Sequence, residues 1–363
     1  MNYSSFVGFQ LKNLGDALAC LPALAFLRAR GVQAALVARP AAARLLTPTL
    51  GEEGVIRADF KSKAWDLAGN LSLIGTLRAK GFQAALGFDH KRRSGLLSFL
   101  AGHKTRVLAP IPGYDAPAWP WRAVSAAPLT GRTGRPPNLI HMAESHVFLA
   151  ALLAGEEPAE LTPALYPRPP AVGEDERARA RALLESLPPG DGPAVGLCLR
   201  GRQREKSWPL PLARASAEFL AQRVGARFFL TGEAADGEIF RALKGICAAP
   251  LADLTGKTSL GEFLALLSVL DLFVSVDTGS AHLAALMGTP LIAIYAVTSP
   301  AQWAPLGGPS RLLCYNQALS RHGLPAEAPS GVAPWVALKA VGPRDIWGAA
   351  ESLGAETAAK WLK

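Results

Sequence analysis

The main indication of the fold of this chain is a repeated alternation of short apolar segments with longer stretches of helical pattern. In the second half, the apolar segment 194–199 precedes a helical stretch at 212–224, and the segment 272–276 precedes another at 280–286. The first half begins in the same way, with a short apolar segment at 7–9 before a helical stretch. Such alternation of strand and helix is typical of parallel, doubly wound sheets. The sequence therefore predicts an α/β fold.

A change of composition near the middle divides this series into two. The stretch 158–193 holds many prolines around one charged helix at 174–186, which is typical of a linker between domains. A chain of 363 residues also exceeds a typical single core. We therefore expect an N-terminal domain at 1–165, a C-terminal domain at 166–342, and a final segment at 343–363 that could pack back on the first domain.

Composition excludes several classes of protein. Half of the residues are hydrophobic and 18% are charged, which argues against disorder. The longest apolar run, 263–276, contains Asp271 and is shorter than the roughly 20 residues that span a bilayer. The four cysteines lie far apart, which predicts neither a zinc cage nor a disulfide framework. We expect a cytoplasmic protein without a transmembrane segment.

The net charge of +9 suggests an anionic partner, such as a phosphorylated substrate, a nucleic acid or a membrane face. A genome rich in G and C would raise the count of arginines without any such partner. The basic residues are scattered, and no basic strand with interleaved aromatic residues and no recognition helix is evident. We therefore expect no nucleic acid.

The most informative motif is the run D-T-G-S-A-H, which begins at Asp277 directly after an apolar segment. In open α/β sheets, ligands bind beyond the carboxyl ends of the strands. The N–H groups of Thr278, Gly279 and Ser280 would therefore lie where a helix N-terminus can hold a pyrophosphate. In isolation, the same residues could simply cap a helix, with His282 paired locally.

A second candidate is the basic loop at 200–206, which follows another predicted strand. Its cations could neutralise a diphosphate leaving group, and Lys206, just ahead of the next helix, is the strongest candidate. The arginines of the loop could equally form a solvated face. Glu233, at the end of the following predicted strand, could bind ribose or base hydroxyls.

The first domain offers one carboxylate at a comparable place. Asp16 follows the first predicted strand, and it would face the expected cleft between the domains. A single carboxylate there suits a general base that takes a proton from an attacking hydroxyl. The alternative is a cap for the helix predicted from Ala17, because Asp favours such positions.

Four stretches together resemble glycosyltransferase family 9, the ADP-heptose:lipopolysaccharide heptosyltransferases. They are "KNLGDALACLPAL" at 12–24, the stretch at 92–108, the stretch at 254–290 that holds "SVDTGSAH", and "YAVTSPAQWAP" at 295–305. The likeness covers most of the chain. Two departures lie near the predicted donor site, namely the arginine-rich loop and Ala296-Val297 where a Gly-Pro pair is common.

The resemblance implies a GT-B architecture, in which two Rossmann-like domains face each other across a cleft. It also implies inverting, metal-independent transfer from a nucleotide sugar, ADP-heptose, to an anionic lipopolysaccharide-core acceptor at the inner face of the inner membrane. Asp16 would be the base and Lys206 the donor-phosphate lysine. The other implied donor contacts are Glu233, Asp277, Thr278, Gly279, Ser280 and His282. No cofactor or metal is expected.

A basic patch, His90-Lys91-Arg92-Arg93, follows the strand predicted at 84–88. Because Arg presents a fork suited to carboxylates and phosphates, Arg92 and Arg93 are candidates for binding the acceptor. They could instead cap and solvate the helix predicted at 95–100. Two further readings stay open: a GT-B enzyme with another donor or a protein acceptor, and a sugar-nucleotide-binding protein without chemistry.

Overall fold

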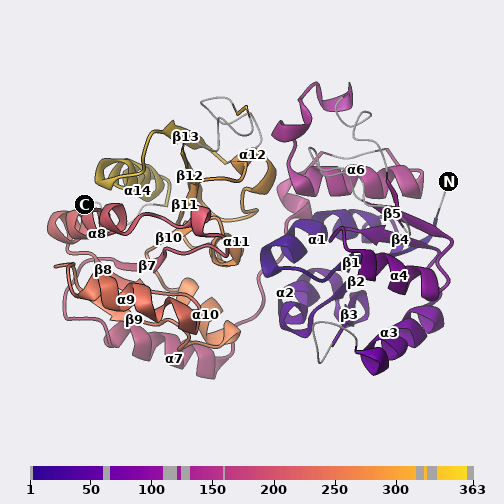
Figure 1. The fold of residues 1–363 in the computed structure, drawn as a ribbon, viewed down its shortest axis with the longest axis horizontal. Helices are drawn as coiled ribbons and strands as arrows, with labels where there is room; N and C mark the ends of the chain where they lie inside the picture. The colour runs from indigo at the N-terminus through magenta and orange to yellow at the C-terminus, as the bar shows by residue number, and fades with distance from the viewer. Residues whose placement is uncertain are drawn as a thin grey trace. The chain divides into compact units, whose positions relative to one another are not determined.

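The computed structural model describes residues 3–59, 66–108, 121–123, 131–157, 160–315, 323–324 and 333–357. The chain divides into two compact units, Met1–Pro170 and Ala171–Lys363. Each unit is built on its own sheet with helices between the strands, as Figure 1 shows, so the predicted α/β class is confirmed. The division falls inside the proline-rich stretch.

The sheet of the first unit is parallel at every pairing, in the order β3-β2-β1-β4-β5-β6. Helix α1 packs against α2 and α6, whereas α3 packs against α4. The strands are β1 Ser5–Gln10, β2 Gln33–Ala38, β3 Val55–Arg57, β4 Ala84–Gly87, β5 Thr105–Leu108 and β6 Arg122–Ala123. The helices are α1 Leu14–Arg28, α2 Pro40–Leu50, α3 Leu67–Lys80, α4 Arg92–Leu100 and α6 Met142–Ala154.

The sheet of the second unit is also parallel, in the order β13-β12-β11-β10-β7-β8-β9. Its strands are β7 Ala194–Cys198, β8 Arg227–Leu230, β9 Leu251–Asp253, β10 Leu272–Val276, β11 Leu291–Tyr295, β12 Ser310–Tyr315 and β13 Trp335–Leu338. Its helices are α7 Glu174–Glu185, α8 Leu210–Val224, α9 Gly237–Lys244, α10 Leu260–Leu267, α11 Gly279–Met287, α12 Pro300–Trp303 and α14 Pro343–Thr357.

The two sheets share one topology. In each, the first strand of the unit lies beside the second on one side and beside the fourth on the other, so the chain changes direction between β1 and β4 and again between β7 and β10. Such reversals are where open α/β sheets bind ligands, just beyond the carboxyl ends of the strands. The loops after these four strands are therefore the places to look for function.

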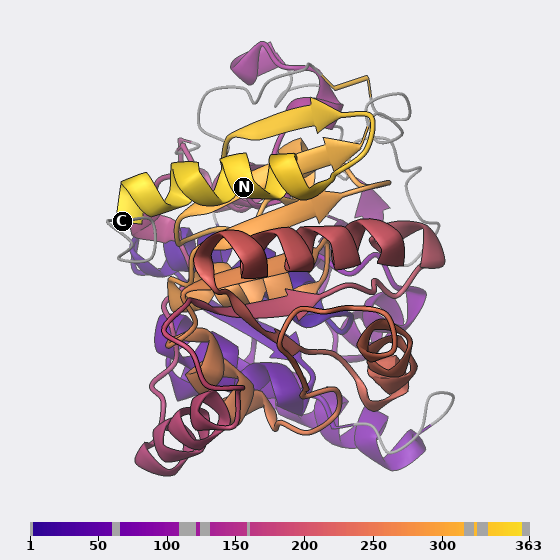
Figure 2. The same ribbon diagram turned by 90° about the vertical axis from the view of Figure 1, so that its left-hand side faces the viewer.

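The last helix belongs to the core of the second unit. Helix α14 packs against α8, β11 and β12, and Figure 2 shows α8 and α14 side by side over the strands. Its buried side chains Ile346, Ala350 and Leu353 lie in the same apolar cluster as Trp208. The return of 343–363 to the first domain stays a prediction, and residues 358–363 lie outside the described ones.

Two helices of the first unit begin earlier than the sequence predicts. Helix α1 starts at Leu14 rather than Ala17, and α4 starts at Arg92 rather than Gly95. The apolar pattern marks the hydrophobic part of a helix, whereas these first turns, Leu14-Gly15-Asp16 and Arg92-Arg93-Ser94, hold few apolar side chains. As a consequence, Asp16 and Arg92 lie inside the first turns of their helices.

Candidate functional site

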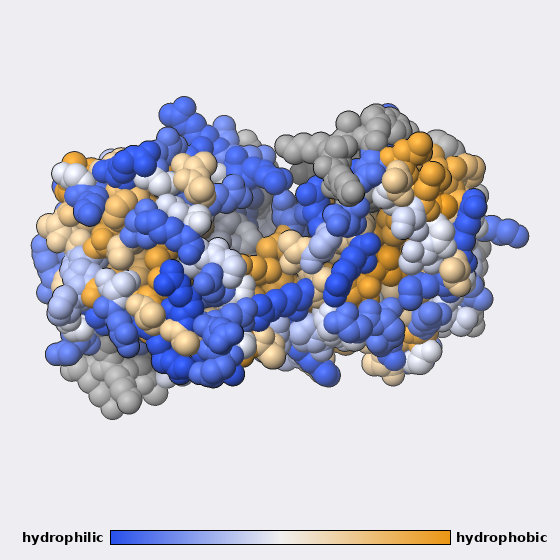
Figure 3. All heavy atoms as spheres, turned by 90° about the horizontal axis from the view of Figure 1, so that it is seen from below, coloured by the Kyte–Doolittle hydropathy of each residue, from blue (hydrophilic) through white to orange (hydrophobic). Residues whose placement is uncertain are grey.

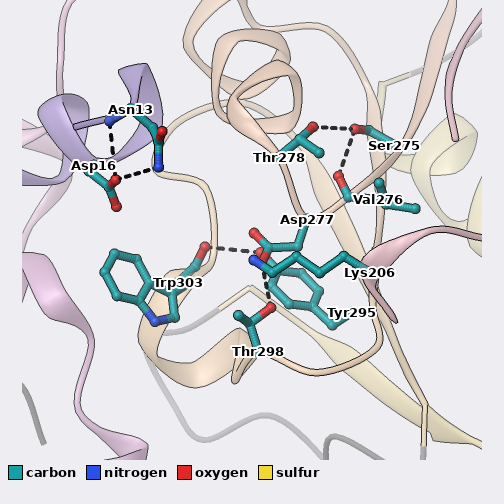
Figure 4. A network of polar contacts seen from close by, with 10 residues as sticks. All are labelled: Asn13, Asp16, Lys206, Ser275, Val276, Asp277, Thr278, Tyr295, Thr298 and Trp303. Atoms are coloured by element: carbon teal, nitrogen blue, oxygen red, sulfur yellow. Dashed lines mark hydrogen bonds and ion pairs between the residues drawn. The ribbon is translucent and has the colours of Figure 1, made fainter. Parts of the chain in front are cut away.

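The carboxyl ends of three neighbouring strands in the second unit bring a polar cluster together around Asp277. This aspartate directly follows β10, and its Oδ2 lies 2.6 Å from Nζ of Lys206 and accepts a hydrogen bond from the hydroxyl of Thr298 (Figure 4). Lys206 comes from the loop after β7, and Thr298 from the loop after β11. The ion pair is largely withdrawn from solvent, with side chains 21% and 9% exposed.

The loop that carries Lys206 is held at both ends. The N–H of Trp208 donates to the carbonyl of Leu199 at 2.9 Å and closes the loop, while the buried indole Nε1 donates to the carbonyl of Val341 at 3.0 Å. A Cβ on Gly201 would lie 2.6 Å from Cβ of Lys206, so only glycine fits there. An ammonium has three donors, and among the described residues only Asp277 accepts one from Lys206.

Helix α11 begins directly after Asp277 with its first N–H groups uncapped. Thr278 occupies the N-cap position, but its side chain makes no capping bond; the hydroxyl instead contacts Ser275 Oγ at 3.2 Å and Cys198 Sγ at 3.8 Å. The first N–H groups of a helix have no partner within it. Gly279 and Ser280 are partly exposed residues that follow Asp277 closely in the chain, and N–H groups at such a helix N-terminus can hold an anion.

The other residues predicted to contact the nucleotide-sugar donor also lie near the carboxyl ends of the strands. Glu233 is exposed after β8, where its N–H donates to Asp236 at 2.9 Å. His282, partly exposed, lies one helical turn beyond Gly279. Arg200 differs from Lys206, because its guanidinium pairs with Glu238 at 2.8 Å and with Asp236 at 3.6 Å. The other loop arginines, Arg202 and Arg204, are exposed, as a solvated face would be.

In the first unit, Asp16 has a local partner. It is the third residue of α1, and its Oδ2 accepts from the side-chain amide of Asn13 at 2.9 Å and from the Asn13 N–H at 3.4 Å. Figure 4 shows this pair. The N-cap of the helix is therefore Asn13 and not Asp16. The carboxylate is partly exposed, and its Oδ1 bonds no described residue.

The two arginines predicted to bind an acceptor have different surroundings. Arg92 is exposed as the first residue of α4, at the carboxyl end of β4. Arg93 is partly buried and donates to the amide oxygen of Asn70 on α3 at 2.8 Å. One arginine is thus presented to solvent, whereas the other joins two helices.

Three polar residues near these strand ends were not singled out from the sequence. Thr298 completes the Asp277 cluster. Asp89, after β4, is fully buried, and burial raises its pKa. His146 is also buried beside the ring of Phe88, and burial lowers its pKa to about 4. A polar residue within three positions after an apolar strand is the signal that could have found Asp89 and Thr298; His146, within a helix, offers none.

No three His, Cys, Asp or Glu side chains of the described residues are grouped as metal ligands would be. No helix in the described part of the chain is long and apolar enough to cross a membrane. The space-filling view of Figure 3 shows hydrophobic side chains in separate patches among hydrophilic ones.

Comparison with known proteins gives consistent matches. The family described as "Glycosyltransferase family 9 (heptosyltransferase)" matches residues 70–322. Lipopolysaccharide heptosyltransferase 3 of Escherichia coli K12 is 26% identical over 65% of this chain and 64% of its own length. The lipopolysaccharide core heptosyltransferase OpsX of Haemophilus influenzae is 40% identical over 19% of this chain and 20% of its own. The chain thus matches less than two thirds of the length of these relatives.

Solved structures agree on the fold. A family 9 glycosyl transferase from Veillonella parvula superposes with a TM-score of 0.71 at 17% identity over 98% of both chains. The E. coli ADP-heptose lps heptosyltransferase II superposes with a TM-score of 0.67 at 21% identity, over 98% of this chain and all of the other. The two-sheet arrangement is therefore the GT-B fold, as predicted.

Proposed function

The chain belongs to glycosyltransferase family 9, and on that premise we propose that it transfers a heptose from ADP-heptose to the inner core of lipopolysaccharide, with inversion and without a metal ion. The observation that carries the proposal is the Asp277–Lys206–Thr298 cluster beside the uncapped N-terminus of α11. The proposal places the enzyme in the cytoplasm, at the inner face of the inner membrane, where the acceptor would be reached.

On the donor side, the departing ADP develops negative charge on its diphosphate. The two remaining ammonium donors of Lys206 and the N–H groups of Gly279 and Ser280 would take up that charge, and donors fixed in advance stabilise a transition state without reorganising. Asp277 cannot bind a phosphate directly, because both are anions. It holds Lys206 in place instead, while the exposed Glu233 suits ribose or base hydroxyls.

On the acceptor side, Asp16 would accept the proton of the attacking hydroxyl. Its Oδ2 is held by Asn13, which leaves Oδ1 for the substrate. Arg92, exposed on the neighbouring helix N-terminus, would bind a carboxylate or phosphate of the acceptor. The oxygen then attacks the anomeric carbon from the side opposite the diphosphate, and the configuration inverts.

The donor is tested by thermal-shift measurements with ADP, UDP and GDP. A nucleotide that binds only the folded protein stabilises it by about 2.7 kcal/mol at a hundredfold excess over its dissociation constant. We expect ADP to raise the melting temperature more than UDP or GDP. A larger shift with UDP or GDP would favour a GT-B enzyme with another donor. Turnover with a lipopolysaccharide-core acceptor separates an enzyme from a binding protein.

The base is tested by Asp16→Asn, which keeps the size of the side chain and removes the proton acceptor. Transfer should fall by a factor on the order of 10²–10⁴, with ADP affinity nearly unchanged. The matched variant is Asn13→Ala, which removes the capping contact but keeps the carboxylate and should lose far less activity. Equal losses in the two variants would show that Asp16 serves only the helix.

Metal independence is tested by assaying transfer in EDTA. In the proposed mechanism Lys206 and the helix terminus supply the charge that a divalent cation would otherwise supply. Activity should therefore persist in EDTA. Loss of activity that Mg²⁺ or Mn²⁺ restores would contradict the proposal.

A further inference from the structure

Asp89 is a buried carboxylate without an ion-pair partner among the described residues. It follows β4 at the point where the first sheet reverses direction, and it is fully buried. Its Oδ2 accepts from the N–H of Leu11 at 3.2 Å and from the hydroxyl of Ser94, and its Oδ1 accepts from the N–H of Lys91 at 3.0 Å. Burying a carboxylate costs free energy unless its oxygens accept hydrogen bonds, and these three bonds together offset that cost.

The three donors come from two different loops. Leu11 begins the turn between β1 and α1, whereas Lys91 and Ser94 belong to the N-terminus of α4. A second buried side chain links the loops in the opposite direction: Gln10 donates to the carbonyl of Phe88 at 3.3 Å and accepts from the N–H of Lys12 at 3.1 Å. Asp89 and Gln10 together therefore fix the two loops to each other.

These are the loops that present the proposed acceptor residues. The turn after Leu11 leads directly into the first turn of α1, which carries Asp16, and Arg92 is the first residue of α4. We infer that Asp89 is a positioning residue that holds the Asp16 turn in register with the N-terminus of α4. The inference rests on the proposed function, because it concerns the geometry of the proposed base.

The first test is Asp89→Asn, followed by two measurements. Hydrogen exchange should become faster at residues 10–13 and 90–93, because an amide group cannot accept from all three donors. The value of kcat should fall on the order of 10²-fold, since a displacement of about 1 Å costs that much. ADP affinity should stay unchanged, because the proposed donor residues lie in the second unit. Faster exchange with an unchanged kcat, or unchanged exchange, would overturn the inference.

A matched pair of variants on α4 separates positioning from stability. Ser94 and Ser98 are both fully buried, but Ser94 donates to Asp89 whereas Ser98 pairs with Nδ1 of His103 at 3.1 Å. Ser94→Ala should lower kcat several-fold without changing the donor KM, whereas Ser98→Ala should lower the melting temperature and leave kcat unchanged. Equal effects of the two variants on kcat would overturn the inference, even if Asp89→Asn does not fold.

The Asp16 and Ser94 variants together distinguish failure of the proposed function from failure of this inference. If Asp16→Asn keeps its activity while Ser94→Ala loses it, Asp16 is not the base, but Asp89 still positions these loops. If Asp16→Asn is inactive and Ser94→Ala is indistinguishable from Ser98→Ala, the base stands and the positioning role is wrong.

Discussion

The two units place an aspartate at the same topological position but surround it differently. Asp89 follows β4 and Asp277 follows β10, and each of these strands is the fourth of its unit and lies beside the first. Both side chains are buried, with 0% and 8% of the residue exposed. Backbone N–H groups and a serine surround Asp89, whereas a lysine and a threonine surround Asp277.

The difference shows how one position can serve two purposes. The hydrogen-bond donors around Asp89 are groups of the protein itself, and all of them bond to its carboxylate. The carboxylate therefore serves to hold the two loops together. The partner of Asp277 is an ammonium with two further N–H donors that bond to none of the described residues, and helix α11, which begins two residues after Asp277, has no side-chain cap. The identity of the partner, and not the aspartate itself, thus separates a site of internal cohesion from the one that we propose binds a ligand.

Among the residues of the Asp277 cluster, replacing Lys206 should have the largest effect. Lys206→Met removes the charge that the proposed mechanism places against the leaving group, and kcat should fall on the order of 10²–10³-fold. ADP affinity, measured by calorimetry, should weaken as well. The matched variant is Arg204→Met, an exposed cation of the same loop, which should behave like the wild type. If Lys206→Met transferred at the normal rate, the pair with Asp277 would be as purely internal as the bonds of Asp89.

Acid should weaken the first unit through two buried histidines. Burial lowers the pKa of His103 and of His146 to about 4, whereas the unfolded chain titrates near 6.5. Between these values the unfolded state binds more protons, so stability is complete above about pH 6.5 and falls as the pH approaches 4. Each histidine contributes roughly 3 kcal/mol to this loss. Denaturant unfolding across this range measures it.

The control for this prediction is His146→Gln, which removes one titrating group from the first unit. Its unfolding free energy should depend less on pH than that of the wild type, although it is lower at neutral pH. A wild-type stability that stays constant from pH 6.5 to 4 would contradict the burial of neutral histidines.

Replacing Arg92 tests the proposed acceptor site in the first unit. Arg92→Ala should raise the acceptor KM roughly tenfold, since a charge-assisted hydrogen bond contributes about 1.5–3 kcal/mol. The donor KM should not change, and the wild-type acceptor KM should rise with salt. Arg93→Ala should have a smaller effect on the acceptor KM and a larger one on stability, because Arg93 joins α4 to Asn70. If the acceptor KM stayed the same in both arginine variants and at every salt concentration, neither arginine would have a role in acceptor binding.

The smallest effect is expected at Thr298. Thr298→Val removes one hydrogen bond to Asp277 but leaves the ion pair, so ADP affinity should weaken only a few-fold, in line with about 1 kcal/mol per hydrogen bond. Thr289→Val is the matched variant, because the Thr289 hydroxyl donates to the carbonyl of Leu267 at 2.6 Å, away from the cluster. It should lower stability without changing ADP affinity. The reverse pattern would place Thr298 outside the site.

The second unit was predicted more accurately than the first. The expected segment 272–276 coincides with β10, and the expected helices at 212–224 and 280–286 differ from α8 and α11 by no more than two residues at either end, because buried strands and helices there are bounded by clear polar and glycine signals. In the first unit, the first turns of α1 and α4 hold few apolar residues and therefore lie outside the apolar pattern that predicted the helices. The same turns carry Asp16 and Arg92, so the error falls where function is proposed.

The α/β class, the ends of the central strands and the polar residues that follow them could be predicted from the sequence, because hydrophobic periodicity and turn residues are local properties. Which of those residues contact one another could not be predicted in this way. Lys206 and Asp277 are 71 positions apart, and Leu11 and Asp89 are 78 apart. Their pairing depends on the order of the strands in the sheet. This order arises from the packing of the whole unit and cannot be recognised in either segment alone.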